Sequence, residues 1–165
     1  MTDVAGPLAR AVALREAGAL DEARELLLEL SSTAPDDAQV AYQTAWVHDA
    51  LGLERDAIPF YVLALDGDGL SAVERRGAML GLGSTYRTLG QYTEAVAVLL
   101  AGVHEFPADR ALAVFLAMAQ YNAGDAKEAV SGLLTLLVGT TSDQEIRRYQ
   151  RAITEYAEDL DRVWS

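Results

Sequence analysis

The two histidines are the residues best suited to acid–base chemistry in this 165-residue chain, which contains no cysteine. His48 falls on the inner side of a predicted helix, and we interpret it as a packed, hydrogen-bonded core residue. His104 lies on the outer side of another predicted helix, where we expect it to be solvated. The sequence has no Gly-x-Ser-x-Gly nucleophile elbow, and Lys127, the one lysine, belongs to no phosphate-binding loop. An enzyme is therefore the weakest functional hypothesis, and we expect no cofactor.

The stretch Asp66-Gly-Asp-Gly is similar to the start of a calcium-binding loop. Such a loop needs glycine at its sixth position and glutamate at its twelfth. Here the glycine falls at the fourth position, and Gly77 stands at the twelfth. We therefore expect no metal site and interpret the stretch as a connecting loop.

The charge of the chain narrows the classes of partner. Thirteen Lys and Arg against 25 Asp and Glu give a formal net charge of −12. Nucleic-acid binding requires cations that displace counterions, and anionic membranes attract basic segments. We therefore expect neither nucleic acid nor membrane as a partner. Apolar residues make up 51% of the chain, enough for a substantial core, and aromatic residues only 7%, so Ala, Leu and Val must build most of it.

Targeting signals are also missing from the sequence. The first residues, 1–4, include an acid and are not followed by the apolar run of a signal peptide. The uncharged stretch 111–124 is too short to span a bilayer, which takes ~20 residues. We therefore expect a cytoplasmic protein. Arg outnumbers Lys twelve to one, which is typical of a GC-rich bacterial genome.

The strongest pattern is an internal repeat, Gly-x-x-x-(Asp/Glu)-Ala, which occurs four times. A small residue precedes each glycine by seven positions, and Leu or Tyr follows each alanine by four. The glycines are spaced by 34, 38 and 34 residues, and they are Gly18, Gly52, Gly90 and Gly124.

Each copy predicts two antiparallel helices joined by a tight turn. Glycine ends a helix because it adopts positive φ at little cost. The alanine five residues later opens the next helix, and its small side chain lets two helices cross closely. Neither helix buries its apolar face alone, so the pairs must stack. The sequence thus predicts an all-α protein.

In these features the chain resembles the tetratricopeptide repeat family, which has a 34-residue helix–turn–helix unit. The third copy matches best, with Gly83, Tyr86, Gly90, Ala95 and Pro107 at the family's spacing. The family's tryptophan at the fourth position is absent. The resemblance implies a right-handed α-α superhelix forming a single domain over residues 1–165. The implied repeats are 4–37, 38–71, 76–109 and 110–143.

After residue 143, apolar residues recur at helical spacing from Ile146 to Trp164. This pattern predicts one amphipathic capping helix over 143–163, the ninth helix in total. Ser71 with Glu74, and Ser142 with Glu145, are predicted capping boxes. We also expect Asp109 and Asp125 to be N-caps, and residues 66–71 to form a loop before a lengthened helix. Pro59 predicts a kink or a later helix start.

The resemblance further implies that the first helix of each pair lines a concave groove. Trp46, one turn after Tyr42, would form an aromatic surface, and arginines there could hold a carboxylate through two hydrogen bonds. The first repeat would contribute Leu8, Val12 and Arg15. The alternative is that Tyr42 and Trp46 pack on the next repeat and that the arginines pair with nearby acids. The predicted groove residues are Tyr42, Trp46, Asp49, Leu80, Ser84, Arg87, Val114, Met118, Tyr121, Asn122 and Arg148.

The function implied by this resemblance is a non-catalytic protein–protein interaction scaffold that binds a peptide or a partner protein in the groove. The alternative is a self-assembly module that forms a homodimer through the terminal helix with Trp164, or through the uncapped first repeat. The sequence does not identify the partner.

Overall fold

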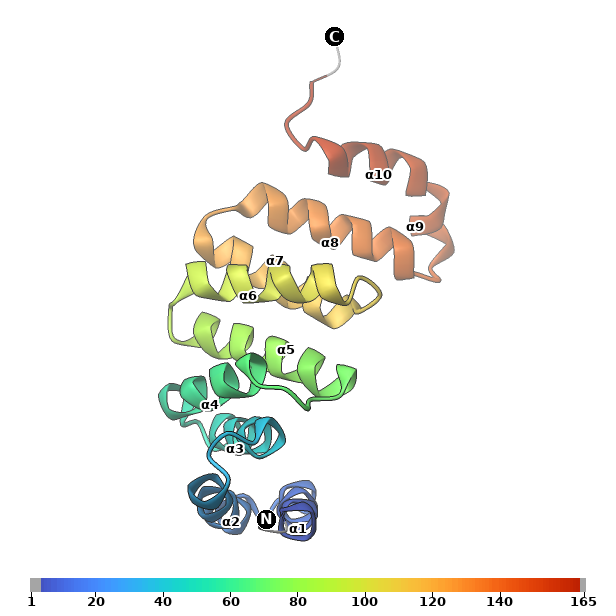
Figure 1. Ribbon diagram of the computed structural model, residues 1–165. Coiled ribbons are helices and arrows are strands. Elements are labelled where there is room, and N and C mark those ends of the chain that lie inside the picture. The colour runs from blue at the N-terminus through green and yellow to red at the C-terminus, as the bar shows by residue number, and fades with distance from the viewer. Residues whose placement is uncertain (1–3, 164–165) are drawn as a thin grey trace. The chain divides into compact units, whose positions relative to one another are not determined.

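The computed structural model describes residues 4–163, and every regular element in that range is an α-helix (Figure 1). The predicted all-α class is therefore confirmed. The chain divides into two compact units, Met1–Gly90 and Gln91–Ser165. The boundary falls inside the predicted third repeat, 76–109, at the turn after its first helix.

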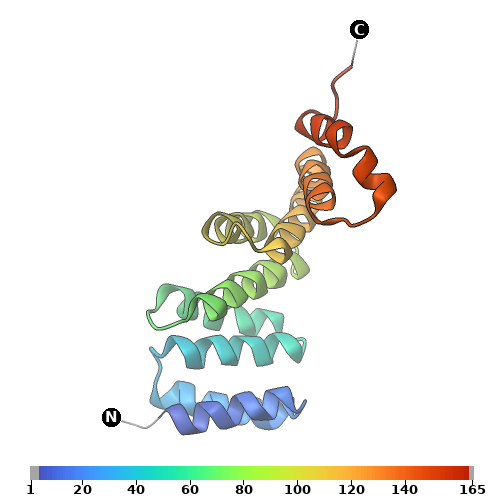
Figure 2. The same ribbon diagram turned by 90° about the vertical axis from the view of Figure 1, so that its right-hand side faces the viewer.

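Unit 1 contains five helices that pack on one another in chain order (Figure 2). Two of them also contact the helix two before them in the chain: α3 contacts α1, and α5 contacts α3. Each of these helices therefore lies against both members of the preceding pair. The helices are α1 (Ala5–Glu16), α2 (Leu20–Thr33), α3 (Ala38–Ala50), α4 (Glu54–Asp66) and α5 (Ala72–Thr88).

The core of unit 1 is built from small and aliphatic side chains, as the composition predicts. Ala11, Ala23 and Leu27 are completely buried, and they cluster with Val40 and Val47 from α3. Removing this apolar surface from water is the main force that holds the helices together. The buried alanines Ala11 and Ala23 stand at the repeat positions for which the sequence predicts small residues.

The repeat glycines lie at the turns where the sequence places them. Gly18 has φ +80° and Gly124 has φ +97°, and the other two glycines are also in the left-handed region. Side chains with a Cβ rarely adopt this conformation. The glycine spacing thus fixes where each pair of helices turns.

Helix α5 is the longest helix, and its start follows the prediction. A loop over 67–71 precedes it, and Ser71 and Glu74 form the predicted capping box. Two glycines inside the helix allow aromatic rings to approach its backbone. A Cβ on Gly81 would lie 2.5 Å from Cζ of Tyr61, and one on Gly77 would overlap the hydroxyl of Tyr42.

Pro59 does not delay the start of α4. The helix begins at Glu54 and continues through the proline to Asp66. The predicted later start is therefore wrong. One missing N–H inside the helix is tolerated because the helix packs on both α3 and α5.

Unit 2 also contains five helices. Helix α7 packs on both α6 and α8, and α10 packs on α8 and α9. Asp109 caps α7, because its Oδ1 accepts a hydrogen bond from the Leu112 N–H at 2.9 Å. Asp125 stands at the predicted N-cap of α8, but its side chain makes no capping bond. The helices are α6 (Tyr92–Glu105), α7 (Arg110–Ala123), α8 (Ala126–Thr140), α9 (Gln144–Arg148) and α10 (Gln150–Glu158).

The predicted single helix over 143–163 is instead two shorter helices, which makes ten in the described range. Tyr149 has φ −101° and ψ 8°, outside helical geometry, and its N–H bonds to the Ile146 carbonyl three residues back. Helix α10 ends at Glu158 because the Asp159 side chain accepts a bond from the Asp161 N–H and forms a turn. The cap of α9 is Asp143, one residue after the predicted Ser142. Trp164 lies outside the described residues.

The last helices cover α8 incompletely. Leu27, Tyr61 and Leu99 stand four residues after the repeat alanine and are at most 2% exposed, whereas Leu133 at the same repeat position is 42% exposed. Helix α10 packs on α8 without a comparable contact to α7. The apolar strip of α8 that includes Leu133 is therefore partly exposed to solvent. Within residues 4–163, no helix is long and apolar enough to cross a membrane.

Candidate functional site

The predicted groove residues lie in both units, and the structure places them in two separate sets. In unit 1 they occupy neighbouring helices, α3 and α5, which pack together. In unit 2 they lie on α7, except for Arg148 on α9. Each set is therefore a surface of its own unit.

Trp46 is the most exposed groove residue of unit 1. Its side chain is 42% exposed, although it lies on a helix whose other central residues are buried. The Tyr42 ring lies against it, with centroids 5.7 Å apart and planes tilted by 39°. The guanidinium carbon of Arg15 from α1 lies 3.4 Å from the tryptophan ring centroid. An exposed aromatic ring in contact with a cation is a common anchor of binding surfaces.

Arg15 is unusual because its charge is largely buried without a full set of partners. Its side chain is 10% exposed, and its Nη2 lies 3.3 Å from Oε1 of the exposed Glu16. No described residue accepts a hydrogen bond from its Nε or Nη1. A buried cation that lacks hydrogen-bond partners is costly, and an added anion would reduce that cost.

Tyr42 supports the site but is not itself exposed. It is 6% exposed, and its ring lies between Trp46 and the backbone of Gly77 on α5. Burial raises the pKa of the Tyr42 hydroxyl above its ordinary value. The predicted aromatic pair is therefore one exposed ring resting on one buried ring.

Asp49 connects three helices within unit 1. Its Oδ1 accepts a bond from Thr85 Oγ1 of α5 at 3.0 Å, and its Oδ2 accepts one from the Tyr61 hydroxyl of α4 at 3.2 Å. Burial raises the pKa of the Asp49 carboxyl, while these two hydrogen bonds act against the increase. Because both oxygens are engaged internally, Asp49 positions the site more than it offers a contact.

The remaining groove residues of unit 1 lie on α5. Leu80, Ser84 and Arg87 are spaced by four and three residues, so they share one face of the helix, and each is partly buried. Arg87 has interactions of its own within the protein. This face continues the surface that begins at Arg15 and Trp46, because α5 packs on α3.

In unit 2, the predicted residues form a partly exposed strip on α7. Val114, Met118 and Tyr121 are spaced by four and three residues, and Tyr121 is 68% exposed. Asn122 is exposed beside them. Arg148 is not part of this strip, since it lies on α9 and pairs with Glu145 at 3.9 Å.

Comparison with known proteins assigns the family. A family profile described as "Tetratrico peptide repeat" matches residues 38–160. The chain belongs to the tetratricopeptide repeat family.

Solved structures agree with this assignment at the level of the fold. A tetratricopeptide repeat protein titled YrrB, described as having an unusual peptide-binding site, matches with a TM-score of 0.75, 19% identity and coverage of 97% of this chain and 79% of its own. MamA from Desulfovibrio magneticus RS-1 matches with a TM-score of 0.74 and 19% identity, covering 96% of this chain and 88% of its own. The D159K mutant of MamA matches with a TM-score of 0.69 and 21% identity, covering 80% and 74%. Curated protein sequences gave no significant match.

His48 has a structural role in this tetratricopeptide repeat protein. It is 2% exposed, its Nδ1 bonds to the Thr44 carbonyl at 2.7 Å, and its ring lies 5.3 Å from that of Phe60. Its Nε2 accepts a bond from Arg24 Nε at 3.3 Å. The interpretation as a packed, hydrogen-bonded core histidine is confirmed. Among residues 4–163, no group of three or more His, Asp and Glu side chains is arranged to hold a metal.

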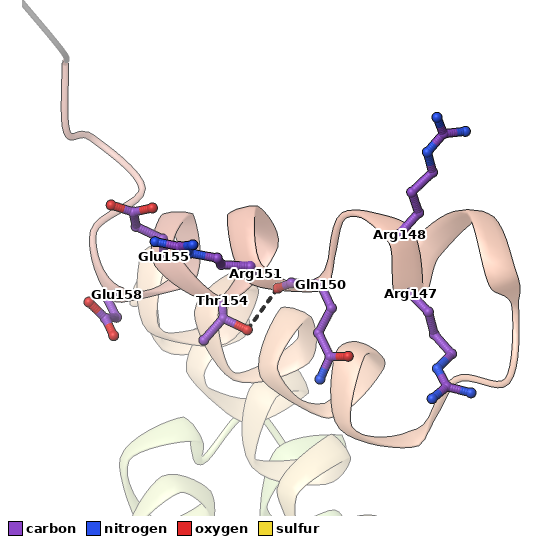
Figure 3. Close-up of a pocket in the computed structure, with 7 residues that line it drawn as sticks. All are labelled: Arg147, Arg148, Gln150, Arg151, Thr154, Glu155 and Glu158. Atoms are coloured by element: carbon purple, nitrogen blue, oxygen red, sulfur yellow. Dashed lines mark hydrogen bonds between the residues drawn. The ribbon is translucent and has the colours of Figure 1, made fainter.

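Two features of the repeat protein were missed by sequence reasoning. Gly77 and Gly81 admit the two tyrosine rings that support the unit 1 surface, and their four-residue spacing inside a predicted helix is the signal that points to them. The second feature is a surface pocket on α9 and α10, where three arginines occur within five residues (Figure 3). It is lined by Arg147, Arg148, Gln150, Arg151, Thr154, Glu155 and Glu158.

Proposed function

We propose that the chain is a non-catalytic interaction scaffold that binds a peptide segment of a partner protein on one face of unit 1. The face is formed by α1, α3 and α5, and Trp46 lies at its centre. The observation that carries the proposal is the contact between the exposed Trp46 ring and the buried Arg15 guanidinium. Exposed aromatic and arginine side chains are enriched among the residues that dominate binding energy.

The proposed ligand carries a carboxylate next to an apolar group. Arg15 supplies positive charge and two donor nitrogens, Nε and Nη1, without partners among the described residues, and a carboxylate can accept from such donors. The Trp46 ring supplies a flat apolar surface beside them. Because the Arg15 guanidinium lies against the Trp46 ring, a ligand bound beside both should change Trp46 fluorescence.

In unit 2, the strip of Val114, Met118 and Tyr121 on α7 is a second candidate peptide contact, considered by itself. The three residues of this strip have the same spacing, four and three residues, as Leu80, Ser84 and Arg87 on the unit 1 face. Asn122 lies beside the strip and could bond a peptide backbone. The net charge of −12 favours basic flanking residues in the partner, because opposite charges steer association.

Peptide selection with a fluorescence readout tests this function. Ligands are selected from a random peptide display against the Trp164→Phe variant, so that Trp46 is the one remaining tryptophan. Selected peptides should change Trp46 fluorescence, and conversion of their carboxylates to amides should weaken binding. Trp46→Ala and Arg15→Gln should each weaken binding ~10-fold or more.

Two controls make the result decisive. Tyr92→Ala removes an exposed aromatic ring from α6 in unit 2 and should leave binding unchanged. Circular dichroism should show the same helicity in all variants. If selected peptides bind Trp46→Ala and Arg15→Gln as tightly as the parent, the α1–α3–α5 face is not the binding surface.

A further inference from the structure

The first helix pair and the last two helices carry surface pockets of opposite charge. The pocket on α9 and α10 has a volume of ≈ 720 Å³ and is lined by three arginines and two glutamates (Figure 3). The pocket on α1 and α2 has a volume of ≈ 390 Å³ and is lined by three glutamates, one arginine and two leucines. Neither pocket belongs to the face proposed for peptide binding.

The basic pocket concentrates positive charge in an acidic chain. Arg147, Arg148 and Arg151 are three of 13 basic residues and lie within five positions of one another. In Figure 3, Arg147 and Arg148 leave α9 in different directions, and Arg151 extends from α10. Arg148 is 3.9 Å from Glu145, but no carboxylate within residues 4–163 pairs with Arg147 or Arg151. These guanidinium groups are therefore available to an anionic partner.

The acidic pocket presents the complementary arrangement. Glu22, Glu25 and Glu29 are spaced by three and four residues, so they share one face of α2, and all three are exposed. No described basic residue forms an ion pair with any of them. Between the helices, Leu14 and Leu26 form an apolar base that is partly buried against the core of unit 1.

Each pocket also contains charged side chains of the sign that is less frequent in it. Arg10 lies at the acidic pocket, and Glu155 and Glu158 lie at the basic pocket. Each pocket therefore carries both signs of charge, with glutamates in excess in one and arginines in excess in the other. At physiological salt the Debye length is ~8 Å, so the charges at a contact outweigh the distant net charge of each copy.

We propose that this chain associates with itself head to tail, with the acidic face of α2 in one copy docked on the arginine face of α9 and α10 in a second copy. Such a contact joins two different surfaces, so each oligomer keeps one free acidic face and one free arginine face, and further copies can add there. The occupant is a second copy because the chain itself carries the matching acidic surface. A contact rich in ion pairs also predicts that association weakens as salt increases.

Neutralising one end at a time tests the proposal. Sedimentation velocity is measured from ~1 to ~100 µM, a range in which weak contacts become populated. The wild-type chain should form species larger than 17.7 kDa that dissociate as NaCl increases from ~0.15 to ~1 M.

One variant, Arg147→Gln with Arg151→Gln, removes the basic end. A second, Glu22→Gln with Glu25→Gln and Glu29→Gln, removes the acidic end. Each variant alone should associate ~10-fold more weakly or not at all.

The mixture of the two variants is the decisive measurement. Each variant retains one working end, so an equimolar mixture should form a capped heterodimer of twice the single-chain mass and nothing larger. The matched control, Arg55→Gln with Arg110→Gln, changes two exposed arginines on α4 and α7 and should associate like the wild type. All substituted residues are exposed, and circular dichroism checks that each variant is folded.

Three results would overturn the proposal. The first is a wild-type chain that stays at 17.7 kDa over the whole concentration range. The second is a mixture that forms no heterodimer although the wild type associates. The third is a control variant that loses association to the same extent, which would assign the effect to net charge alone.

Discussion

The Tyr61 ring lies directly against the backbone of Gly81, so that a Cβ at this position would be 2.5 Å from Cζ and 2.9 Å from Cε1 of the ring. Tyr61 cannot move away easily, because it is 2% exposed and its hydroxyl donates to Asp49. This contact brings α4 and α5 together beside the proposed peptide-binding face. It also shows that a glycine inside a helix can be required by a neighbouring side chain.

Gly81→Ala should therefore destabilise the protein by ~1–3 kcal/mol, because the added methyl group overlaps a ring that has no space to move. The matched control is Gly132→Ala in α8, where a Cβ would meet nothing within 4 Å. That substitution should stabilise by ~0.5–1 kcal/mol, since alanine favours the helix. Urea unfolding measures both values, and equal effects at the two sites would contradict the packing argument.

Asp49→Asn should raise the free energy of unfolding at neutral pH. Burial raises the folded-state pKa of Asp49 above its ordinary value of 3.8, so the charged form is disfavoured by folding. The stability that this group contributes is fully present below pH 3.8 and is lost as pH rises through the raised value. Asparagine is neutral at every pH and retains an oxygen that can accept from Thr85.

The measurement is the difference in unfolding free energy between Asp49→Asn and wild type across this pH range. The difference should be largest at neutral pH and should decrease as pH falls through the raised pKa of folded Asp49 toward the ordinary value of 3.8. Glu94→Gln on α6, whose carboxylate is exposed, serves as a control for general charge effects. A variant that is less stable than wild type at neutral pH, by an amount that shrinks as pH falls, would show that the carboxylate hydrogen bonds outweigh desolvation.

Leu99→Ala should cost ~2–5 kcal/mol, because Leu99 is completely buried and the substitution leaves a cavity. Leu133→Ala removes the same atoms at the same repeat position, but Leu133 is 42% exposed. The second substitution should therefore cost less than half as much. Similar losses in thermal unfolding would mean that Leu133 is covered in solution.

Asp109→Ala should destabilise by ~0.5–2 kcal/mol through loss of the cap of α7. Asp125 occupies the equivalent place before α8, but its side chain makes no capping bond. Asp125→Ala should consequently have a smaller effect. Chemical denaturation of the two variants compares these positions, and a larger loss for Asp125→Ala would contradict the geometry.

The sequence predicts well those features that depend on local chemistry. The turns at Gly18 and Gly124 require only a positive φ, and glycine adopts it without help from distant residues. The capping box at Ser71 and Glu74 likewise forms within four residues. The buried alanines follow from the repeat, because each copy needs a small residue where two helices cross.

Features that depend on distant contacts were not predictable in the same way. The role of Gly81 depends on Tyr61, which lies on a different helix. The break at Tyr149 and the turn at Asp159 replace a helix that the apolar spacing of 143–163 favours. In the candidate site, the sequence places Trp46 and Tyr42 on one helix, but the position of Arg15 on the Trp46 ring results from the packing of α1 on α3.

The partly uncovered apolar strip of α8 has a consequence for protein engineering. An additional helical hairpin inserted after Thr140, with leucines directed at Leu133, would bury an apolar surface of α8 that α9 and α10 leave partly exposed. Unit 2 could thus be extended at α8 by grafted helix pairs without a redesign of its existing core.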